Sequence, residues 1–516
     1  MIDSATKDMI ELEVNDFGPV VAAKIDLRPL TVFIGPSNTG KSYLAILTYA
    51  LHRHFSDESN LVNRRFRRMP TMFIDHYGSR KWPERTIEEF IDLAKKIGIE
   101  SEQNRPAKSI NFSDSIVEFI RSKFEDQGNT IGDVILRCFG VNHSKDLVRK
   151  GKKGSANIVL RKRNENTSDP IEHRMEINSS FGSFNTKFPD RNEIRLKLGK
   201  NEYLSRYLQH SAMRLISQSG LEGEPKNSHL WEFSQAIIDC MRPQIVGPLR
   251  APAFYLPADR TGIMHAHSVV VGALIESAAM TGLRPAAPSM PMLSGVLADF
   301  LEQLIQLDRF SHGRRKPRHN LDKAIEATIL KGEIGFDKSI GTGYPHYTYK
   351  PKGWAEDISL MHASSMVSEL APVVLYLRHV VMAGDVLIVE EPESHLHPAM
   401  QVEFTRQLAS LVKAGIRVIV TTHSEWVLEE LAHTVRRSQI PKSRSVDVGG
   451  NHPARTPNQV GAWLFKQRSR PKGTVVEEVI LDYETGLYPT DYDIVSENLY
   501  NESASIFRHI QSGNLK

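Results

Sequence analysis

The chain has only two cysteines in 516 residues, Cys138 and Cys240, far apart and outside any Cys-x-x-Cys spacing. Such sparse cysteine excludes a disulfide-stapled fold and a cysteine-rich zinc site. Long apolar runs are missing too, because the most apolar region, 371–389, is interrupted by charged residues, and the start of the chain lacks a basic segment followed by an apolar one. We therefore expect a soluble, cytoplasmic protein without a membrane partner.

The sequence also lacks an excess of one charge. Lys and Arg number 65 against 61 Asp and Glu, which gives a net charge of +4. This balance excludes polyanion binding over the whole surface but leaves local basic patches open. No internal repeat with a period of about 20 to 50 residues occurs, which excludes solenoids and propellers. The length and the hydrophobic content of 40% predict two or three units with buried cores.

Apolar runs of β-forming residues alternate with helical segments near both ends of the chain, which predicts an α/β fold with a mixed, mostly parallel sheet. The predicted strands are 31–34, 386–389 and 416–420, and the predicted helices are 43–51, 365–381 and 399–413. Residues 55–250 instead contain short, charged segments and turn clusters, typical of an inserted α+β domain. The predicted organisation is a head formed by 1–54 and 251–516, interrupted by this insertion.

The insertion contains a locally basic stretch. Residues 141–200 carry 14 Lys and Arg, among them Lys152, Lys153 and Arg161, against 7 Asp and Glu. A solvated loop surface and a phosphate-binding surface for DNA or RNA are both compatible with this pattern.

A glycine-rich loop after the first buried strand is the strongest motif. The pattern Gly-x-x-x-x-Gly-Lys-Ser lies between the strand and a helix, where backbone N–H groups can surround a phosphate chain. A lysine then reaches the β and γ phosphates, and the serine hydroxyl ligates Mg²⁺. The predicted ATP-binding residues are Gly35, Pro36, Ser37, Asn38, Thr39, Gly40, Lys41, Ser42 and Tyr43.

Two adjacent acids end the second buried strand, in Val386-Leu387-Ile388-Val389-Glu390-Glu391. The first acid of such a pair holds Mg²⁺ and the second activates the water that attacks the γ-phosphate. We expect Glu390, with Ser42, on the metal side and Glu391 as general base, with Glu393 as the alternative base. Aspartate is usual at the first position, so Glu390 lengthens that side chain.

The third buried strand ends in Thr421-Thr422-His423-Ser424. A histidine at the end of a strand beside the acidic strand can form a hydrogen bond to the γ-phosphate and report its presence. We expect His423 to take this catalytic role together with Lys41. For His395 and His397 we expect a structural or dimer-contact role, because no third metal ligand has suitable spacing.

Small hydroxyl residues precede the predicted helix 365–381. Ser364 and Ser365 at a helix start can present hydroxyls, N–H groups and the helix dipole to phosphate. The alternative is a capping box that begins at Ser365.

The order of these motifs resembles the ABC-type ATPase heads of the OLD family and their SMC-like relatives. The strings Tyr255-Leu256-Pro257-Ala258-Asp259-Arg260 and Lys331-Gly332-Glu333-Ile334 resemble that group as well. The resemblance covers 1–54 and 253–500. It implies heads that dimerise, with ATP between the P-loop of one subunit and Ser364 and Ser365 of the other. It places Asp259 or Arg260 in the Q-loop region, and Met366 replaces a usual signature glycine.

Within this group the chain is similar to the ATPase components of the Septu and PARIS anti-phage defence systems. The implied function is an ATP-hydrolysing sensor or regulatory subunit that controls a separately encoded nuclease or toxin. One alternative is an SMC-like DNA repair or recombination ATPase, although the insertion lacks sustained heptads. Another is a metal-dependent nuclease that uses Asp491, Asp493 and acids of the insertion, with the two aspartates expected in a turn after Pro489. An ABC transporter subunit fits the motifs least.

Overall fold

A computed structural model describes most of the chain, in segments. The described residues are 9–56, 84–102, 109–125, 128–151, 154–163, 170–178, 181–188, 195–197, 203–219, 227–266, 269–270, 272, 293–307, 319–337, 345–440, 455–480 and 490–513. They form two compact units. One unit contains residues 3–18 and 47–253, and the other contains 19–46 and 254–516. The predicted division at 54 and 250 stays a prediction. Two unit boundaries, after residues 46 and 253, lie close to it, whereas residues 3–18, predicted in the head, belong to the first unit.

The second unit is built on a mixed sheet whose strand order is β2-β16-β15-β3-β14-β13-β9. These strands are β2 (Val20–Leu27), β3 (Leu30–Ile34), β9 (Ala253–Leu256), β13 (Val386–Glu390), β14 (Arg417–Thr422), β15 (Val460–Ser469) and β16 (Lys472–Val479). Strands β13, β14, β3 and β15 are parallel neighbours, whereas β16 runs antiparallel to β15. Every residue of β3, β9 and β13 is buried. Parallel strands covered on both faces need such continuous apolar runs.

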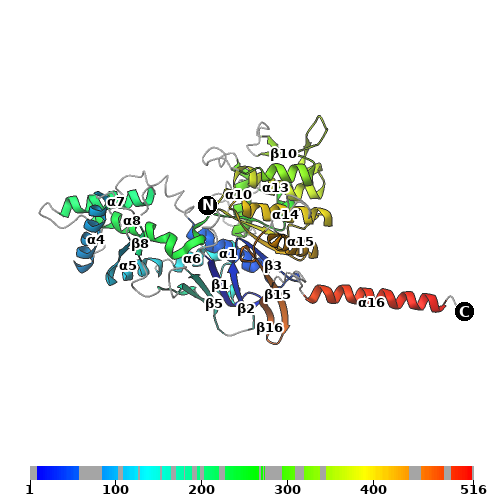
Figure 1. Cartoon of the computed structure of the whole chain (residues 1–516), viewed down its shortest axis with the longest axis horizontal. Coiled ribbons are helices and arrows are strands. Elements are labelled where there is room, and N and C mark those ends of the chain that lie inside the picture. The colour runs from blue at the N-terminus through cyan, green and yellow to red at the C-terminus, as the bar shows by residue number, and fades with distance from the viewer. Residues whose placement is uncertain are drawn as a thin grey trace, which may run out of the picture. The chain divides into compact units, whose positions relative to one another are not determined.

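Helices cover this sheet because alternate strand residues point to opposite faces. Leu30, Val32 and Ile34 of β3 join a core with apolar residues of helices α10, α13, α14 and α15. These helices are α10 (Gly295–Ile305), α13 (Ser365–His379), α14 (Pro398–Lys413) and α15 (Glu425–Arg436). Figure 1 draws α13, α14 and α15 as neighbours beside β3 and β15. On the other face the rings of Phe33 and Phe465 lie 5.5 Å apart.

Smaller elements complete the second unit. Helix α1 (Lys41–Phe55) follows β3 and continues into the segment assigned to the other unit. A three-stranded antiparallel sheet consists of β10 (Gly332–Asp337), β11 (His346–Pro351) and β12 (Ile358–Ser359). Two further helices are α12 (Leu321–Ile325), which continues as a π-helical turn to Leu330, and α16 (Thr490–Gly513).

The first unit is α+β, as predicted for the insertion. Its main strands are antiparallel in the order β7-β6-β5-β1. They are β1 (Met9–Phe17), β5 (Ala156–Arg163), β6 (Ile171–Ile177) and β7 (Phe181–Lys187), with a second pair β4 (Ser109–Asn111) and β8 (Arg195–Lys197). Its helices are α4 (Glu84–Glu102), α5 (Asp114–Glu125), α6 (Gly128–Phe139), α7 (Tyr203–Ser219) and α8 (Asn227–Val246).

Candidate nucleotide site

The glycine-rich loop joins β3 to α1, so the strand, loop and helix lie where the sequence predicts them. Gly35, Asn38 and Gly40 have positive φ values of 137°, 63° and 95°, which tightens the turn. A Cβ on Gly35 would lie 2.6 Å from the Phe465 carbonyl oxygen, and one on Gly40 would lie 2.7 Å from Pro19 Cγ. Both positions therefore require glycine.

A hydrogen bond within the loop closes the turn and leaves several loop residues exposed. Thr39 is buried and its hydroxyl donates to the Pro36 carbonyl at 2.8 Å, which holds the two ends of the turn together. The remaining loop residues differ in exposure: Pro36, Ser37, Asn38 and Ser42 are exposed, and Tyr43 is half-buried.

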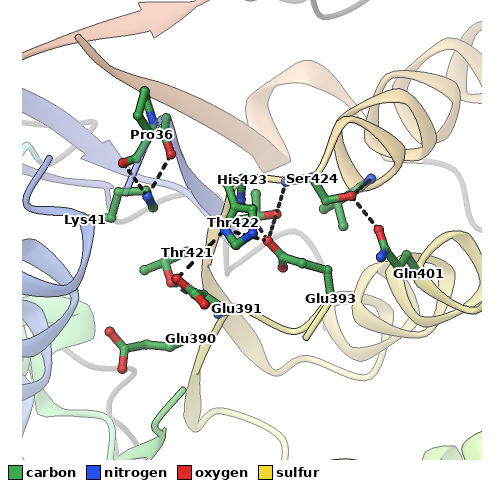
Figure 2. A network of polar contacts seen from close by, with 12 residues as sticks. Pro36, Lys41, Glu390, Glu391, Glu393, Gln401, Thr421, Thr422, His423 and Ser424 are labelled. Carbon is green, nitrogen blue, oxygen red and sulfur yellow. Dashed lines mark hydrogen bonds and ion pairs between the residues drawn. The ribbon is translucent and has the colours of Figure 1, made fainter. Parts of the chain in front are cut away.

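Lys41 is the buried cation at the start of α1. Its Nζ donates to the carbonyl oxygens of Gly35 at 2.7 Å and Pro36 at 2.8 Å (Figure 2). Burial lowers the pKa of Lys41, and Glu391, Glu393 and Glu390 oppose this shift. The lysine therefore lies in the field of all three acids of the acidic strand end.

Glu390 is the last residue of β13 and its carboxylate is buried. Its Oε2 accepts a hydrogen bond from the Ala258 N–H at 3.3 Å. Burial raises the pKa of Glu390, while the nearby hydroxyls of Ser42 and Tyr255 oppose the rise. Oε1 has no hydrogen-bond partner of good geometry among the described residues.

A carboxylate with an unused oxygen beside the Ser42 hydroxyl fits Mg²⁺, which takes one or two protein oxygens together with water and phosphate. No group of three His, Cys, Asp or Glu residues in the described segments could hold a metal alone.

Glu391 follows β13 in a left-handed conformation, with φ of 42°. Its N–H donates to the Thr421 carbonyl oxygen at 2.9 Å, and Thr421 Oγ1 lies 3.3 Å from the same nitrogen. This turn leaves the Glu391 carboxylate half-buried, with Oε1 at 3.8 Å from His423 Nδ1. Figure 2 shows Glu391 and His423 facing each other beside the loop that carries Lys41.

Glu393 is a residue whose role the motif reasoning missed, since it treated Glu393 only as an alternative base. Its side chain is 5% exposed and Oε1 lies 3.4 Å from His423 Nδ1. The same oxygen accepts hydrogen bonds from Thr422 Oγ1 at 2.7 Å and from the His423 N–H at 2.8 Å. Glu393 therefore holds the end of β14 and positions His423. The signal in the sequence was a third acid two residues after Glu391.

Helix α13 begins one residue earlier than a capping box at Ser365 would require. Ser364, not Ser365, is the N-cap, and its hydroxyl accepts from the Val367 N–H at 3.4 Å. Ser364 and Ser365 are both exposed, and Met366 packs partly on the core. Among the described contacts, no hydrogen bond or ion pair joins either serine to the cluster around Lys41.

Arg260 occupies the region that the resemblance assigned to a Q-loop, and it is fully buried. Its Nη2 pairs with the carboxylate of Glu369 in α13. Its other contacts are backbone carbonyl oxygens, so Arg260 cannot reach outward to a nucleotide in this arrangement.

The two histidines after the acidic strand are exposed. His397 is the N-cap of α14 and its Nδ1 accepts from the Ala399 N–H at 3.3 Å, which is a structural role. His395 has a positive φ of 60°. A dimer-contact role for either histidine stays a prediction.

Some of the basic side chains in this stretch of the insertion are paired with acids where the structure describes them. Arg161 forms ion pairs with Glu11 at 2.8 Å, Glu13 at 2.5 Å and Glu172 at 2.8 Å. Lys162 is buried and its Nζ donates to the Gln244 carbonyl at 2.7 Å. Lys152 and Lys153 lie outside the described residues.

The Asp491-Tyr492-Asp493 string lies in the first turns of α16, not in a turn after Pro489 as predicted. Its neighbour Pro489 lies outside the described residues. A pair of nuclease acids is expected at a strand end, so the observed helix does not match that prediction. In the described segments, no helix has the length and apolar character needed to cross a membrane.

Comparison with known proteins identifies an ATPase segment. A family model described as an AAA ATPase domain matches residues 296–428, less than half of the chain. This segment includes α13, β13, β14 and His423. With the β3-loop-α1 arrangement and the mixed sheet, the match confirms the predicted α/β P-loop ATPase fold. No sequence of a curated protein matches the chain.

Solved structures give a weaker likeness. The chain is similar to the SMC head domain from Thermotoga maritima at 10% identity, with 92% of this chain and 99% of that chain covered and a TM-score of 0.35. It is also similar to an Smc head domain with an extended coiled coil, bound to the C-terminal domain of ScpA and derived from Pyrococcus furiosus. That match has 12% identity, covers 95% and 99% of the two chains, and has a TM-score of 0.36.

Proposed function

We propose that the chain binds ATP with Mg²⁺ and hydrolyses it to ADP and phosphate. The observation that carries this proposal is the convergence of Lys41, Ser42, Glu390, Glu391 and His423 at the ends of three adjacent parallel strands. Ligands of open α/β sheets bind at such carboxyl ends.

Each residue has a role that its position supports. Lys41 contributes positive charge to the phosphates, and the backbone N–H groups of the loop hold them. Ser42 and Glu390 would hold Mg²⁺, which neutralises charge on the phosphate oxygens. Glu391 is the better general base, because Oε1 of Glu393 is already occupied by Thr422 and His423. His423 lies beside Glu391 and donates to the γ-phosphate.

We propose that the chain forms a homodimer in which each copy covers the nucleotide bound by the other. Ser364 and Ser365 are exposed at the N-terminus of the 15-residue helix α13 and have no contact with the Lys41 cluster among the described residues. Exposed hydroxyls and N–H groups at a helix start favour phosphate. In a homodimer these serines would complete the site of the partner.

The first experiment measures ATP affinity by calorimetry, ATP turnover and mass in solution for the wild type. Lys41→Ala removes the phosphate-binding cation, and Lys413→Ala, an exposed lysine at the end of α14, is its matched control. Loss of binding only in Lys41→Ala supports the proposal. Equal ATP affinity in the two variants would rule out the P-loop assignment.

We further propose that this ATPase is the sensor or regulatory subunit of an antiviral defence complex and controls a separate effector. The support is the resemblance of the motifs together with an α+β unit that is compact by itself and is not a coiled-coil pair in its described part. Because Arg161 is paired with acids within the unit and the buried Lys162 donates to a backbone carbonyl oxygen, we favour a protein effector over nucleic acid as its partner.

Co-purification from the native operon, with ATP and Mg²⁺ present, tests the effector. A stoichiometric nuclease or toxin in the mass spectrum supports the sensor role. A chain that purifies alone, inert toward DNA, favours the SMC-like repair alternative instead, and DNA cleavage by the chain alone would restore the nuclease alternative.

A further inference from the structure

Arg260 connects three segments of the ATPase unit through its guanidinium group. It follows β9 and is fully buried. Four hydrogen bonds run to backbone carbonyl oxygens: Nε to Glu369 at 3.2 Å, Nη1 to Pro257 at 2.9 Å, Nη1 to Glu390 at 2.6 Å and Nη2 to Glu391 at 3.2 Å. The planar, rigid fork of arginine can hold several acceptors in fixed directions at once.

The fifth contact of Arg260 reaches the helix that carries the exposed serines. Nη2 pairs with Glu369 Oε1, and the Glu369 side chain is 1% exposed. Thr261, next to Arg260 in the chain, donates its hydroxyl to Glu369 Oε2. Glu369 lies in the second turn of α13, about 7 Å along the helix axis from Ser364 at ~1.5 Å per residue. A helix of this length is stiff, so fixing Glu369 also fixes the serines.

Stability gives little reason for this ion pair. The Arg260 and Glu369 side chains are 0% and 1% exposed, so both groups have lost their contact with water. Buried ion pairs often stabilise no better than apolar residues of equal volume. Arg260 nevertheless donates to the backbone carbonyl oxygens of Glu390 and Glu391, the two acids of the nucleotide site. This contact indicates that the pair serves to position these segments.

We propose that Arg260 is a positioning residue that keeps the N-terminus of α13 in register with Glu390 and Glu391, so that each subunit presents Ser364 and Ser365 correctly to the nucleotide of its partner. This inference rests on the proposed dimeric ATPase. Arg260 touches neither the nucleotide nor the reacting atoms, because its donors face carbonyls and Glu369.

Complementation between two inactive variants isolates this effect. Ser365→Arg has an intact P-loop and a blocked signature, whereas Lys41→Ala has an intact signature and no functional P-loop. Neither homodimer should hydrolyse ATP, but their mixed dimer contains one complete site. Adding Arg260→Met and Glu369→Met to the Lys41→Ala chain changes only the signature presented to that site. The double change leaves no unpaired buried charge, but four backbone carbonyl oxygens lose their donor, so we expect a variant that folds with reduced stability.

The matched control places Arg406→Met and Glu430→Met in the Lys41→Ala chain. This pair joins α14 to α15 in the same unit at 3.1 Å, and Glu430 also pairs with Arg437 at 2.7 Å. Its described partners do not include the acidic strand end. Thermal melting and co-elution with Ser365→Arg verify that all chains fold and assemble.

We expect kcat of the mixed dimer to fall about 100-fold with the Arg260 and Glu369 changes, the scale of a ~1 Å misplacement. KM for ATP should stay unchanged, because the P-loop comes from the other chain, and the control should retain full kcat. Arg260→Lys, which keeps the charge but not the fork, should restore less than a tenth of kcat. An unchanged kcat in the Arg260 and Glu369 variant would overturn the inference.

The proposed function fails in a different way. If the wild type hydrolyses ATP but Ser365→Arg and Lys41→Ala do not complement each other, the shared site is wrong, and the inference is wrong with it. If they complement each other and the Arg260 changes have no effect, only the inference is wrong.

Discussion

Glu393→Ala is the substitution for which the structure gives the clearest magnitude. The change removes the acceptor of two hydrogen bonds, from Thr422 Oγ1 at 2.7 Å and from the His423 N–H at 2.8 Å. Each buried donor left without an acceptor costs about 1–3 kcal/mol. We therefore expect a loss of about 3–4 kcal/mol in the free energy of unfolding of the ATPase unit.

Differential scanning calorimetry measures this loss as a shift of the transition that ATP stabilises. At ~2 °C per kcal/mol, because the unit has more than about 250 residues, the shift is about 6–8 °C. Glu393→Gln keeps one acceptor oxygen and serves as the control, with an expected loss of about 1 kcal/mol. Both variants should bind ATP, since Lys41 is intact, but only Glu393→Ala should lose most of its hydrolysis. A melting temperature within ~2 °C of the wild type for Glu393→Ala would refute the role assigned to Glu393.

Lys41→Ala should weaken ATP binding about 100-fold in Kd, because a charge-assisted hydrogen bond contributes roughly 2–3 kcal/mol; normal affinity by calorimetry would contradict this. Glu391→Gln should retain ATP, slow turnover by about 10²–10⁴ and accumulate dimers, whereas Glu356→Gln, an exposed control, should behave as wild type in turnover and light scattering. Ser42→Ala should raise the Mg²⁺ concentration needed for half-maximal turnover, and an unchanged metal titration would remove Ser42 from the metal site. Burial lowers the pKa of His173 to about 4, so the folded first unit binds fewer protons than the unfolded chain. Above pH 6.5 this difference in proton binding does not reduce the free energy of unfolding. As the pH falls from 6.5 toward 4, the free energy of unfolding decreases by up to about 3 kcal/mol. His173→Phe should flatten the acid limb of a plot of stability against pH, and an identical limb would refute this.

Much of the ATPase unit could be predicted because its strands are short, fully apolar runs. The sequence predicted strands at 31–34 and 386–389, and the structure has Leu30–Ile34 and Val386–Glu390. Neighbouring parallel strands end at the same edge of a sheet, so the motif residues after them were expected together. Glycine at 35 and 40 was also decided locally, by the turn.

What could not be predicted depends on contacts between distant segments. The pairing of Arg161 with Glu11 and Glu13 joins strands about 150 residues apart in the chain, so counting charges along 141–200 could not show the neutralisation. The N-cap at Ser364 rather than Ser365 depends on a single backbone torsion. Arg260 was located in the right region, but its burial and its carbonyl partners follow from the packing of β9 on α13.

The strand register has a consequence for how this chain tolerates change. Ile34 is level with Thr422, and Thr421 is level with Glu390, across three adjoining strands. Sliding one strand by a single residue would displace its motif by about 3.3 Å and turn its side chains to the opposite face. Natural variation is therefore expected to spare the length of these strands and to accumulate instead in the connections between them. Evolution could replace the whole segment between α1 and β9 with another one. Such a replacement would change the partner protein and leave the residues at the strand ends in place.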